Sequence, residues 1–225
     1  MSDVQRFDYA GTGLEDSVPQ APWELVSRWV REAQEAADER ADVYEPSAMA
    51  VATVDRTGLP DVRTVLLRFL DPRGPGFVTS RHSQKAAQIS DTHLIAATLT
   101  WAPLFRAIRF RGVAQQIESD ITDEYWGGRP WGSRISAWAS RQSHPVASRQ
   151  VMEDTVRDLA QRYPDMGNPD DVPVPPDWVG YRIHPQEVEF WAGRPDRLHD
   201  RIRYAAASPA DLDDAAAWST TRLQP

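Results

Sequence analysis

The hydrophobic positions along the chain first follow the period of a helix and then change to that of β-strands. Residues 1–20 are polar with Gly and Pro, and they predict an arm without a core of its own. From Pro22 the apolar residues recur at the i, i+3, i+4 spacing of one helical face, and Pro suits a first helical turn. These residues are Leu25, Val26, Trp29, Val30 and Ala33. From Met49 onward the pattern predicts strands.

Strands and their turns account for much of the remaining pattern. Apolar runs at 50–54 and 62–70 flank the turn Asp55-Arg56-Thr57-Gly58 and predict a hairpin. Further strands are expected at 76–79, 94–101, 105–117, 179–183, 188–191 and 198–204. Helices are expected from the N-cap Ser83 to Ile89, from Ser119 to Tyr125, around Ile135 and Trp138, and from Val146 to Tyr163. In the last of these helices, the residues expected to face inward are Val151, Val156, Leu159 and Ala160. Segments 167–177 and 205–217 are expected to be loops, the second solvated.

Many short strands with helices grouped between them predict an α+β fold that is mainly antiparallel β, a barrel with packed helices. Residues 21–225 are expected to form one domain after the arm. A chain of 225 residues with 41% hydrophobic content can bury a sizeable core. The sequence contains neither a Gly-x-Gly-x-x-Gly fingerprint nor a Gly-Lys-Ser/Thr phosphate loop, so nothing supports a Rossmann or P-loop fold.

The composition narrows the function classes. The chain has no Cys, which excludes disulfides, thiol catalysis and Cys-ligated metals and fits a cytoplasmic location. A net charge of −8 argues against a nucleic-acid partner. No apolar run approaches about 18 residues, and the N-terminus has no basic-then-apolar leader, so we expect no membrane span or signal peptide. No metal site is expected.

The candidate chemistry is concentrated near the carboxyl end. Trp191 is followed by Arg197-Leu198-His199-Asp200-Arg201. If this segment is an extended strand, Arg197, His199 and Arg201 point the same way and form an anion-binding surface. The alternative is a solvated strand edge that carries an incidental His.

This segment resembles the C-terminal signature of the pyridoxine (pyridoxamine) 5'-phosphate oxidases. The resemblance runs from about Arg6 to Pro225 in several ordered blocks and weakens only at 205–217. It implies a split β-barrel that binds FMN at the interface of a homodimer, with site residues from both subunits.

The resemblance also assigns residues to the cofactor. The FMN-binding residues that it implies are Arg63, Thr64, Val65, Leu66, Arg68, Val78, Thr79, Ser83, Gln84, Lys85, Gln142, Ser143, Trp191 and Arg201. Free N–H groups at a helix start, together with Lys85, suit a phosphate dianion. Val78, Gln84 and Ala107 depart from the Tyr, Arg and Gln that are usual in the family, so they weaken the expected FMN contacts.

A second set of residues is implied for the substrate. Arg68, where the family usually has Lys, and Tyr125, Arg129 and Ser133 would hold a phosphate, because two hydroxyls and guanidiniums suit a phosphate monoester. Tyr125 and Arg129 could instead serve in packing and a surface ion pair. Arg197 and His199 would face the substrate ring and are the catalytic candidates. Arg6 and Tyr9 belong to an arm that covers the site.

The implied activity is oxidation of pyridoxine or pyridoxamine 5'-phosphate to pyridoxal 5'-phosphate, with FMN as the cofactor, O2 as the acceptor and H2O2 as the by-product. An alternative is a relative that oxidises a reduced aromatic ring in phenazine biosynthesis, a branch that Gln84 resembles. The third alternative is a non-catalytic flavin- or pyridoxal-phosphate-binding protein.

Overall fold

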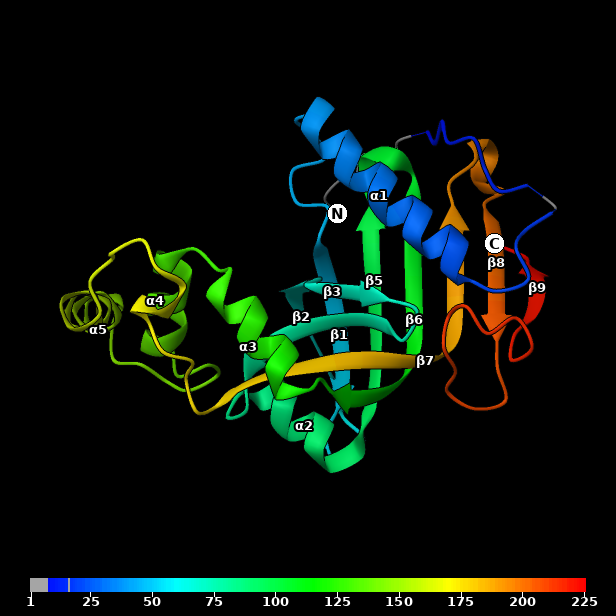
Figure 1. Ribbon diagram of the computed structural model, residues 1–225. Coiled ribbons are helices and arrows are strands. Elements are labelled where there is room, and N and C mark those ends of the chain that lie inside the picture. Colours follow the sequence, from blue (N-terminus) through cyan, green and yellow to red (C-terminus); the bar gives the residue numbers. More distant parts are fainter. Residues whose placement is uncertain (1–7, 16) are drawn as a thin grey trace, which may run out of the picture.

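The computed structural model describes residues 8–15 and 17–225, and an antiparallel sheet forms the centre of this part of the chain (Figure 1). Its strands are β1 Ala48–Val54, β2 Pro60–Leu66, β3 Phe69–Asp71, β4 Gly74–Ser80, β5 Leu94–Trp101, β6 Arg106–Gln116, β7 Trp178–Ala192, β8 Asp200–Ala205 and β9 Ser219–Leu223. The helices are α1 Trp23–Glu39, α2 Gln84–Thr92, α3 Ser119–Gly127, α4 Trp131–Ala139 and α5 Arg149–Arg162. Short 3₁₀ turns occupy Ala102–Leu104 (η1), Pro169–Asp171 (η2) and Pro195–Arg197 (η3). The predicted α+β fold with a mainly antiparallel split barrel is confirmed.

The sheet is organised around β7. Its strand order is β2-β1-β5-β6-β7-β4-β3, and every pairing is antiparallel. One edge of β7 pairs with β6, while the other edge pairs with β4 along its first residues and with β8 along its last. The predicted strands 179–183 and 188–191 are therefore one strand of 15 residues. β9, which the sequence pattern did not predict, pairs with β8.

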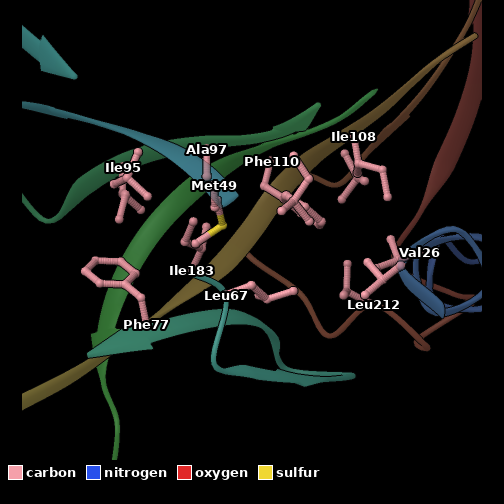
Figure 2. Close-up of a cluster of buried hydrophobic side chains, with 14 of the residues drawn as sticks. Val26, Met49, Leu67, Phe77, Ile95, Ala97, Ile108, Phe110, Ile183 and Leu212 are labelled. Carbon is pink, nitrogen blue, oxygen red and sulfur yellow. The ribbon is translucent and has the colours of Figure 1, made fainter. Parts of the chain in front are cut away.

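One face of this sheet carries the main core. Side chains alternate along each strand, so a row such as Val51, Ala97 and Phe110 lies on one face, and these residues are buried. Figure 2 shows Ala97 and Phe110 within this core. Helix α1 packs onto this core with the five apolar residues that its spacing predicts, all of them buried. The helix is also held by Arg106, which pairs with Glu32 and lies 4.8 Å from the Trp29 ring centroid.

The opposite face of the sheet is more polar. Ala52, Ala96 and Arg111 line a cavity of about 540 Å³ on this side. Val62 and Leu94 remain 64% and 52% exposed. Large exposed aliphatic side chains on a sheet face are a feature that a second protein surface commonly covers.

Helices α3, α4 and α5 form a smaller cluster beside the sheet (Figure 1). Trp126 is buried there and donates from Nε1 to the carbonyl of Val172 at 2.8 Å. The buried Arg134 donates to the carbonyls of Asn168 and Pro169 and ties α4 to η2. The prediction that Val151 faces inward was wrong, because this residue of α5 is 48% exposed.

The predicted strand 62–70 breaks at Leu67 and Arg68. The backbone N–H of Leu67 donates to the carbonyl of Ser47, whereas that of Arg68 donates to Gly76. Two consecutive residues therefore bond to different neighbours, which ends β2 and begins the pairing of β3 with β4.

The 205–217 segment is a loop, but the prediction that it is only a solvated one was wrong. Leu212 is 0% exposed and belongs to the main core. Its N–H donates to the carbonyl of Pro72 at 2.6 Å, and its carbonyl accepts from Trp23 at 3.0 Å. This loop therefore joins the start of α1 to the turn before β4.

In the part of the chain that the structure describes, no helix combines the length and apolarity needed to cross a bilayer.

Truncation of Leu212 tests this assignment. We expect Leu212→Ala to lower the free energy of unfolding by about 2–5 kcal/mol, because it leaves a cavity in a packed core. Leu59→Ala, at a residue that is 67% exposed, should change it by less than about 0.5 kcal/mol. Urea denaturation of both variants measures the difference. Equal stability of the two would contradict the structural role of this loop.

Candidate functional site

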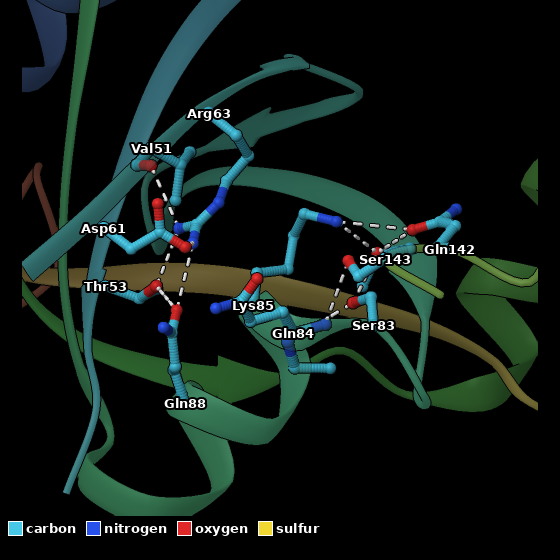
Figure 3. Close-up of polar contacts among 12 residues, drawn as sticks. Val51, Thr53, Asp61, Arg63, Ser83, Gln84, Lys85, Gln88, Gln142 and Ser143 are labelled. Atoms are coloured by element: carbon cyan, nitrogen blue, oxygen red, sulfur yellow. Dashed lines mark hydrogen bonds and ion pairs between the residues drawn. The ribbon is translucent and has the colours of Figure 1, made fainter. Parts of the chain in front are cut away.

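A polar cluster surrounds the start of α2, where β4 ends (Figure 3). Ser83 caps the helix, as predicted, and its hydroxyl accepts from the N–H of Ala86. Thr79 is only 2% exposed and donates from Oγ1 to Oε1 of Gln142 at 2.7 Å. The Nζ of Lys85 donates to Oγ1 of Thr79 at 3.2 Å and to Oε1 of Gln142 at 3.3 Å. The N–H of Gln84 donates to the hydroxyl of Ser143 at 3.2 Å. The helix start thus gathers donors suited to an anion.

Arg63 lies beside this cluster on the core face of β2. Its guanidinium donates to Asp61 at 2.7 Å, to the hydroxyl of Thr53 at 2.6 Å and to Oε1 of Gln88 at 3.0 Å (Figure 3). These contacts hold the guanidinium in one orientation.

Lys85 is the only lysine in the sequence. Its partial burial lowers the pKa of its ammonium group, and repulsion from Arg63 lowers this pKa further, against a smaller opposite effect of Asp61. Because an anion between Lys85 and Arg63 would relieve both effects, the charge pattern favours a negatively charged ligand.

Two cavities of about 460 Å³ adjoin one another here. One is lined by residues of the Lys85 cluster, Asp61, Arg63, Gln84, Lys85, Ser140, Gln142 and Ser143. The other is lined by Val78, Arg129, Gly132, Ser133, Ser136, Ala137, Ser140, Gln142 and Trp178. Ser140 and Gln142 belong to both cavities. Each cavity therefore contains a cationic side chain with hydroxyl or amide groups, and the two share a wall.

Arg129 provides the cation of the second cavity. Its guanidinium carbon lies 4.7 Å from the ring centroid of Trp178 and 5.9 Å from that of Tyr125. One amino group donates to the carbonyl of Ser133, while the buried Nε has no hydrogen-bond partner among the described residues. Burial lowers the pKa of Arg129, and the nearby charge of Arg68 lowers it further, against an opposite effect of Tyr125. The four residues predicted to bind a substrate phosphate are thus neighbours, although Ser133 lies on α4 rather than on α3 or its following turn.

The carboxyl-terminal cluster differs from the predicted extended strand. Arg197 ends η3 with a φ of 62°, and β8 begins only at Asp200. Arg197 is exposed, whereas the His199 ring lies 4.8 Å from the rings of both Trp191 and Tyr9. Arg197, His199 and Arg201 therefore do not form one alternating strand face. Tyr9, which the resemblance assigns to an arm over the site, lies against His199 and Trp191, while Arg6 lies outside the described residues.

Arg201 is held by a buried carboxylate that sequence reasoning missed. Glu189 is 6% exposed and accepts from Arg201 at 2.8 Å and from Arg109 at 2.6 Å. Burial alone would raise the pKa of Glu189, but the two guanidiniums outweigh it and hold the pKa below its usual range.

The two clusters lie on opposite faces of the sheet. Arg63 pairs across from Val51, which is in the core, so its side chain starts on the core face. Trp191 alternates with the buried Phe190 and stands opposite Arg201, so both lie on the other face. Figure 1 also shows β8 and α4 at opposite ends of the molecule. One chain therefore does not bring all the predicted cofactor residues together.

The other residues predicted for the cofactor lie on the strand that carries Arg63 or directly after it. Thr64, Val65, Leu66 and Arg68 lie on or just after β2, with Thr64 and Arg68 exposed. The sequence pattern missed Ser140 and Trp178 in the cavity walls. Their only signal is position, since Ser140 is the C-cap residue directly after α4 and Trp178 begins β7.

Comparison with known proteins identifies the family of this chain. Residues 35–163 match the family model described as "Pyridoxamine 5'-phosphate oxidase". Residues 178–225 match the model described as "Pyridoxine 5'-phosphate oxidase C-terminal dimerisation region". The chain belongs to the pyridoxamine 5'-phosphate oxidase family. It is accordingly an oxidoreductase, which removes the alternative of a non-catalytic binding protein.

Family relatives match over nearly the full length. A pyridoxine/pyridoxamine 5'-phosphate oxidase of Kineococcus radiotolerans is 41% identical over 98% of this chain and 97% of its own length. One of Rubrobacter xylanophilus is 40% identical over 98% and 94%. Among solved structures, PhzG from Burkholderia lata in complex with tetrahydrophenazine-1-carboxylic acid has a TM-score of 0.80 and 32% identity, covering 96% of this chain and 100% of that one.

The lowered pKa of Lys85 can be measured directly. With ¹³C-labelled lysine, NMR titration of the cofactor-free protein should show a single Cε signal, from the carbon bonded to Nζ, whose pKa lies below the ordinary lysine value. Arg63→Gln should raise this pKa only in part, because burial is the larger cause. Arg149→Gln, which removes an exposed charge from α5, should leave it unchanged. A wild-type pKa at the ordinary value would contradict the described burial.

Proposed function

We propose that this family member is an FMN-dependent oxidase that converts pyridoxine or pyridoxamine 5'-phosphate to pyridoxal 5'-phosphate, with O2 as acceptor and H2O2 released. The observation that carries the proposal is the pair of adjoining cavities. Lys85 serves one and Arg129 the other, and Gln142 lies in the wall between them. Two neighbouring anion sites match a reaction in which cofactor and substrate each carry a phosphate.

The residues of the first cavity fit the phosphate of FMN. The start of α2 offers N–H groups, Ser140 and Ser143 offer hydroxyls, and Lys85 offers a charge. Val78 adds no polar atom to this set. The remaining donors are already arranged by hydrogen bonds among themselves, so little reorganisation is needed on binding.

A second copy of the chain would complete the site. Trp191 and Arg201 face the opposite side of the sheet from Arg63, so one cofactor can meet both groups only where two chains come together. We therefore propose a homodimer in which the cofactor lies between the core-face cluster of one copy and the outer face of the other. The match of 178–225 to a dimerisation region supports this arrangement.

Bound FMN would supply the two-electron oxidation of the substrate carbon. Arg129, held against Trp178, would orient the substrate through its phosphate. His199 would meet the substrate ring. Its Nδ1 accepts from the backbone N–H of Arg194 at 3.1 Å, so the neutral imidazole carries its proton on Nε2. From Nε2 it would donate a hydrogen bond to the phenolic oxygen of the substrate ring. Glu189 would keep Arg201 directed at the cofactor.

The second candidate is oxidation of a reduced phenazine ring. The similarity to PhzG with its bound tetrahydrophenazine carboxylate favours it, as does Gln84. The Arg129 cavity argues for the phosphorylated vitamer, because a half-buried guanidinium in a cavity lined by serines would otherwise lack an anionic partner among the described residues.

Substitution of Arg129 separates the two candidates. Arg129→Ala should cost about 1.5–3 kcal/mol of transition-state stabilisation for pyridoxine 5'-phosphate, the scale of a charged hydrogen bond, which lowers kcat/KM by about ten- to 150-fold. The same change should hardly affect a substrate without phosphate. Arg149→Ala, at an exposed arginine on α5, is the control. Faster oxidation of a dihydrophenazine carboxylate, with Arg129→Ala neutral for both substrates, would overturn the assignment in favour of the phenazine relative.

The cofactor assignment makes a separate prediction about pH. FMN phosphate favours the charged form of Lys85, so FMN affinity should be highest while Lys85 is charged and the phosphate is a dianion. From there it should decrease as pH rises through the lowered pKa of Lys85. Lys85→Ala should weaken binding by about 1.5–3 kcal/mol and abolish this decrease. Fluorescence titrations of FMN and FAD across pH measure both effects. Bound FAD after purification, or the same pH profile in both proteins, would be inconsistent with the proposed site.

A further inference from the structure

Asp200 belongs to the carboxyl-terminal motif, yet neither the cofactor nor the substrate assignment gives it a role. It begins β8, and its side chain is 17% exposed. Its Oδ2 accepts from the backbone N–H of Leu14 at 2.9 Å, and its Oδ1 accepts from Arg222 of β9 at 2.7 Å. Arg194 lies 3.4 Å from Oδ2. The carboxylate therefore joins the N-terminal arm to three segments near the carboxyl end.

The arm is held on both sides of its backbone. Arg222, which pairs with Asp200, also donates to the carbonyl of Glu15 at 2.9 Å and to that of Leu14 at 3.4 Å. The N–H and C=O groups of one short segment are thus bonded to a single ion pair. Hydrogen bonds to charged groups are stronger than those between neutral groups, so this contact holds the arm firmly.

Gly13 shows how closely the arm approaches. Its φ is +79°, and a Cβ at this position would collide with the guanidinium of Arg194 and with Oδ2 of Asp200. Only glycine fits both the backbone conformation and the space. The approach of the arm to Asp200 is therefore specific to this path of the chain.

The held segment carries Tyr9 to the candidate substrate residues. The Tyr9 ring lies 4.8 Å from the His199 ring, 5.8 Å from that of Trp191 and 5.6 Å from that of Phe105, each in an edge-to-face arrangement. Asp200 directly follows His199, and Arg194 contacts both residues, through its N–H to His199 and through its guanidinium to Asp200. The arm contact and the His199 contact therefore share one short loop.

We propose that Asp200 is a positioning residue that fastens the N-terminal arm and thereby places Tyr9 over His199 and Trp191. Asp200 itself touches neither reacting group. Its effect on catalysis, which rests on the function proposed above, is to keep the substrate enclosed once bound. Release of the arm weakens substrate retention without weakening FMN binding, because the Asp200 side chain lies outside the Lys85 cluster and bonds to Leu14, Arg194 and Arg222 rather than to Trp191 or Arg201.

Two variants break the contact from its two sides. Asp200→Asn keeps the shape of the side chain and removes its charge, while Gly13→Ala pushes the arm away with Asp200 intact. Asp213→Asn is the control for the first, an exposed acid in the 205–217 loop. Gly58→Ala is the control for the second, because Gly58 also has a positive φ, +88°, but no atom of the described residues lies within 4 Å of a Cβ there.

Hydrogen–deuterium exchange of the 8–15 segment, read out on the full-length holoenzyme, tests the contact itself. Exchange should become about tenfold faster or more in Asp200→Asn and Gly13→Ala, and stay as in wild type in both controls. Unchanged exchange in Asp200→Asn would overturn the proposal. This readout does not depend on which substrate the enzyme oxidises, so it decides the arm contact even if the proposed function fails.

Steady-state kinetics on the same four proteins tests the consequence. The KM for pyridoxine 5'-phosphate should rise severalfold in both arm variants, while kcat and FMN affinity stay close to wild type. A released arm with an unchanged KM would overturn the positioning role. An equal loss of FMN affinity would do so as well, because it would indicate a general structural effect rather than one on the arm.

Discussion

The antiparallel pairing of β6 with β7 is the constraint on which the rest of the structure depends. It continues from Arg106 opposite Ala192 to Gln116 opposite Tyr181, with one register shift at Arg111/Gly112. This register places Phe190 opposite Ile108 in the core and Glu189 opposite Arg109 on the other face. Because β7 also pairs with β4 and β8, the segment that leads to α2 and the strand that carries Arg201 are attached to the same 15 residues.

That arrangement explains how binding residues come from distant parts of the sequence. Thr79 lies near the end of β4, beside the start of α2, and hydrogen bonds there to Gln142 and Lys85. Glu189 lies on β7, and its buried carboxylate accepts a hydrogen bond that orients Arg201. Such a buried carboxylate is costly to leave without its guanidinium partners, because its charge would then be buried and uncompensated. The polar groups on both faces of the sheet are therefore oriented before any ligand binds.

Local patterns in the sequence predicted much of this architecture. The apolar face of α1, the β1–β2 hairpin and the Ser83 cap each depend on neighbouring residues, and each is present. The break at Leu67 and Arg68 was not predictable, since it arises from bonds to two separate partners. Leu212 was hidden in an Ala- and Asp-rich loop that gives no periodic signal. Likewise, the assumption that 197–201 is extended could not account for the turn at Arg197, which has a positive φ.

The proposal of a site shared between two copies depends on the opposite orientation of Arg63 and Trp191. Complementation in mixed dimers tests it most directly. One copy would carry Lys85→Ala with Arg129→Ala, and the other Arg197→Ala with His199→Ala, each pair nearly inactive alone. A purified hybrid should regain about half of the wild-type activity, because one of its two equivalent sites is then free of substitutions. A hybrid as inactive as its parents would show that each site lies within a single chain and would contradict the account.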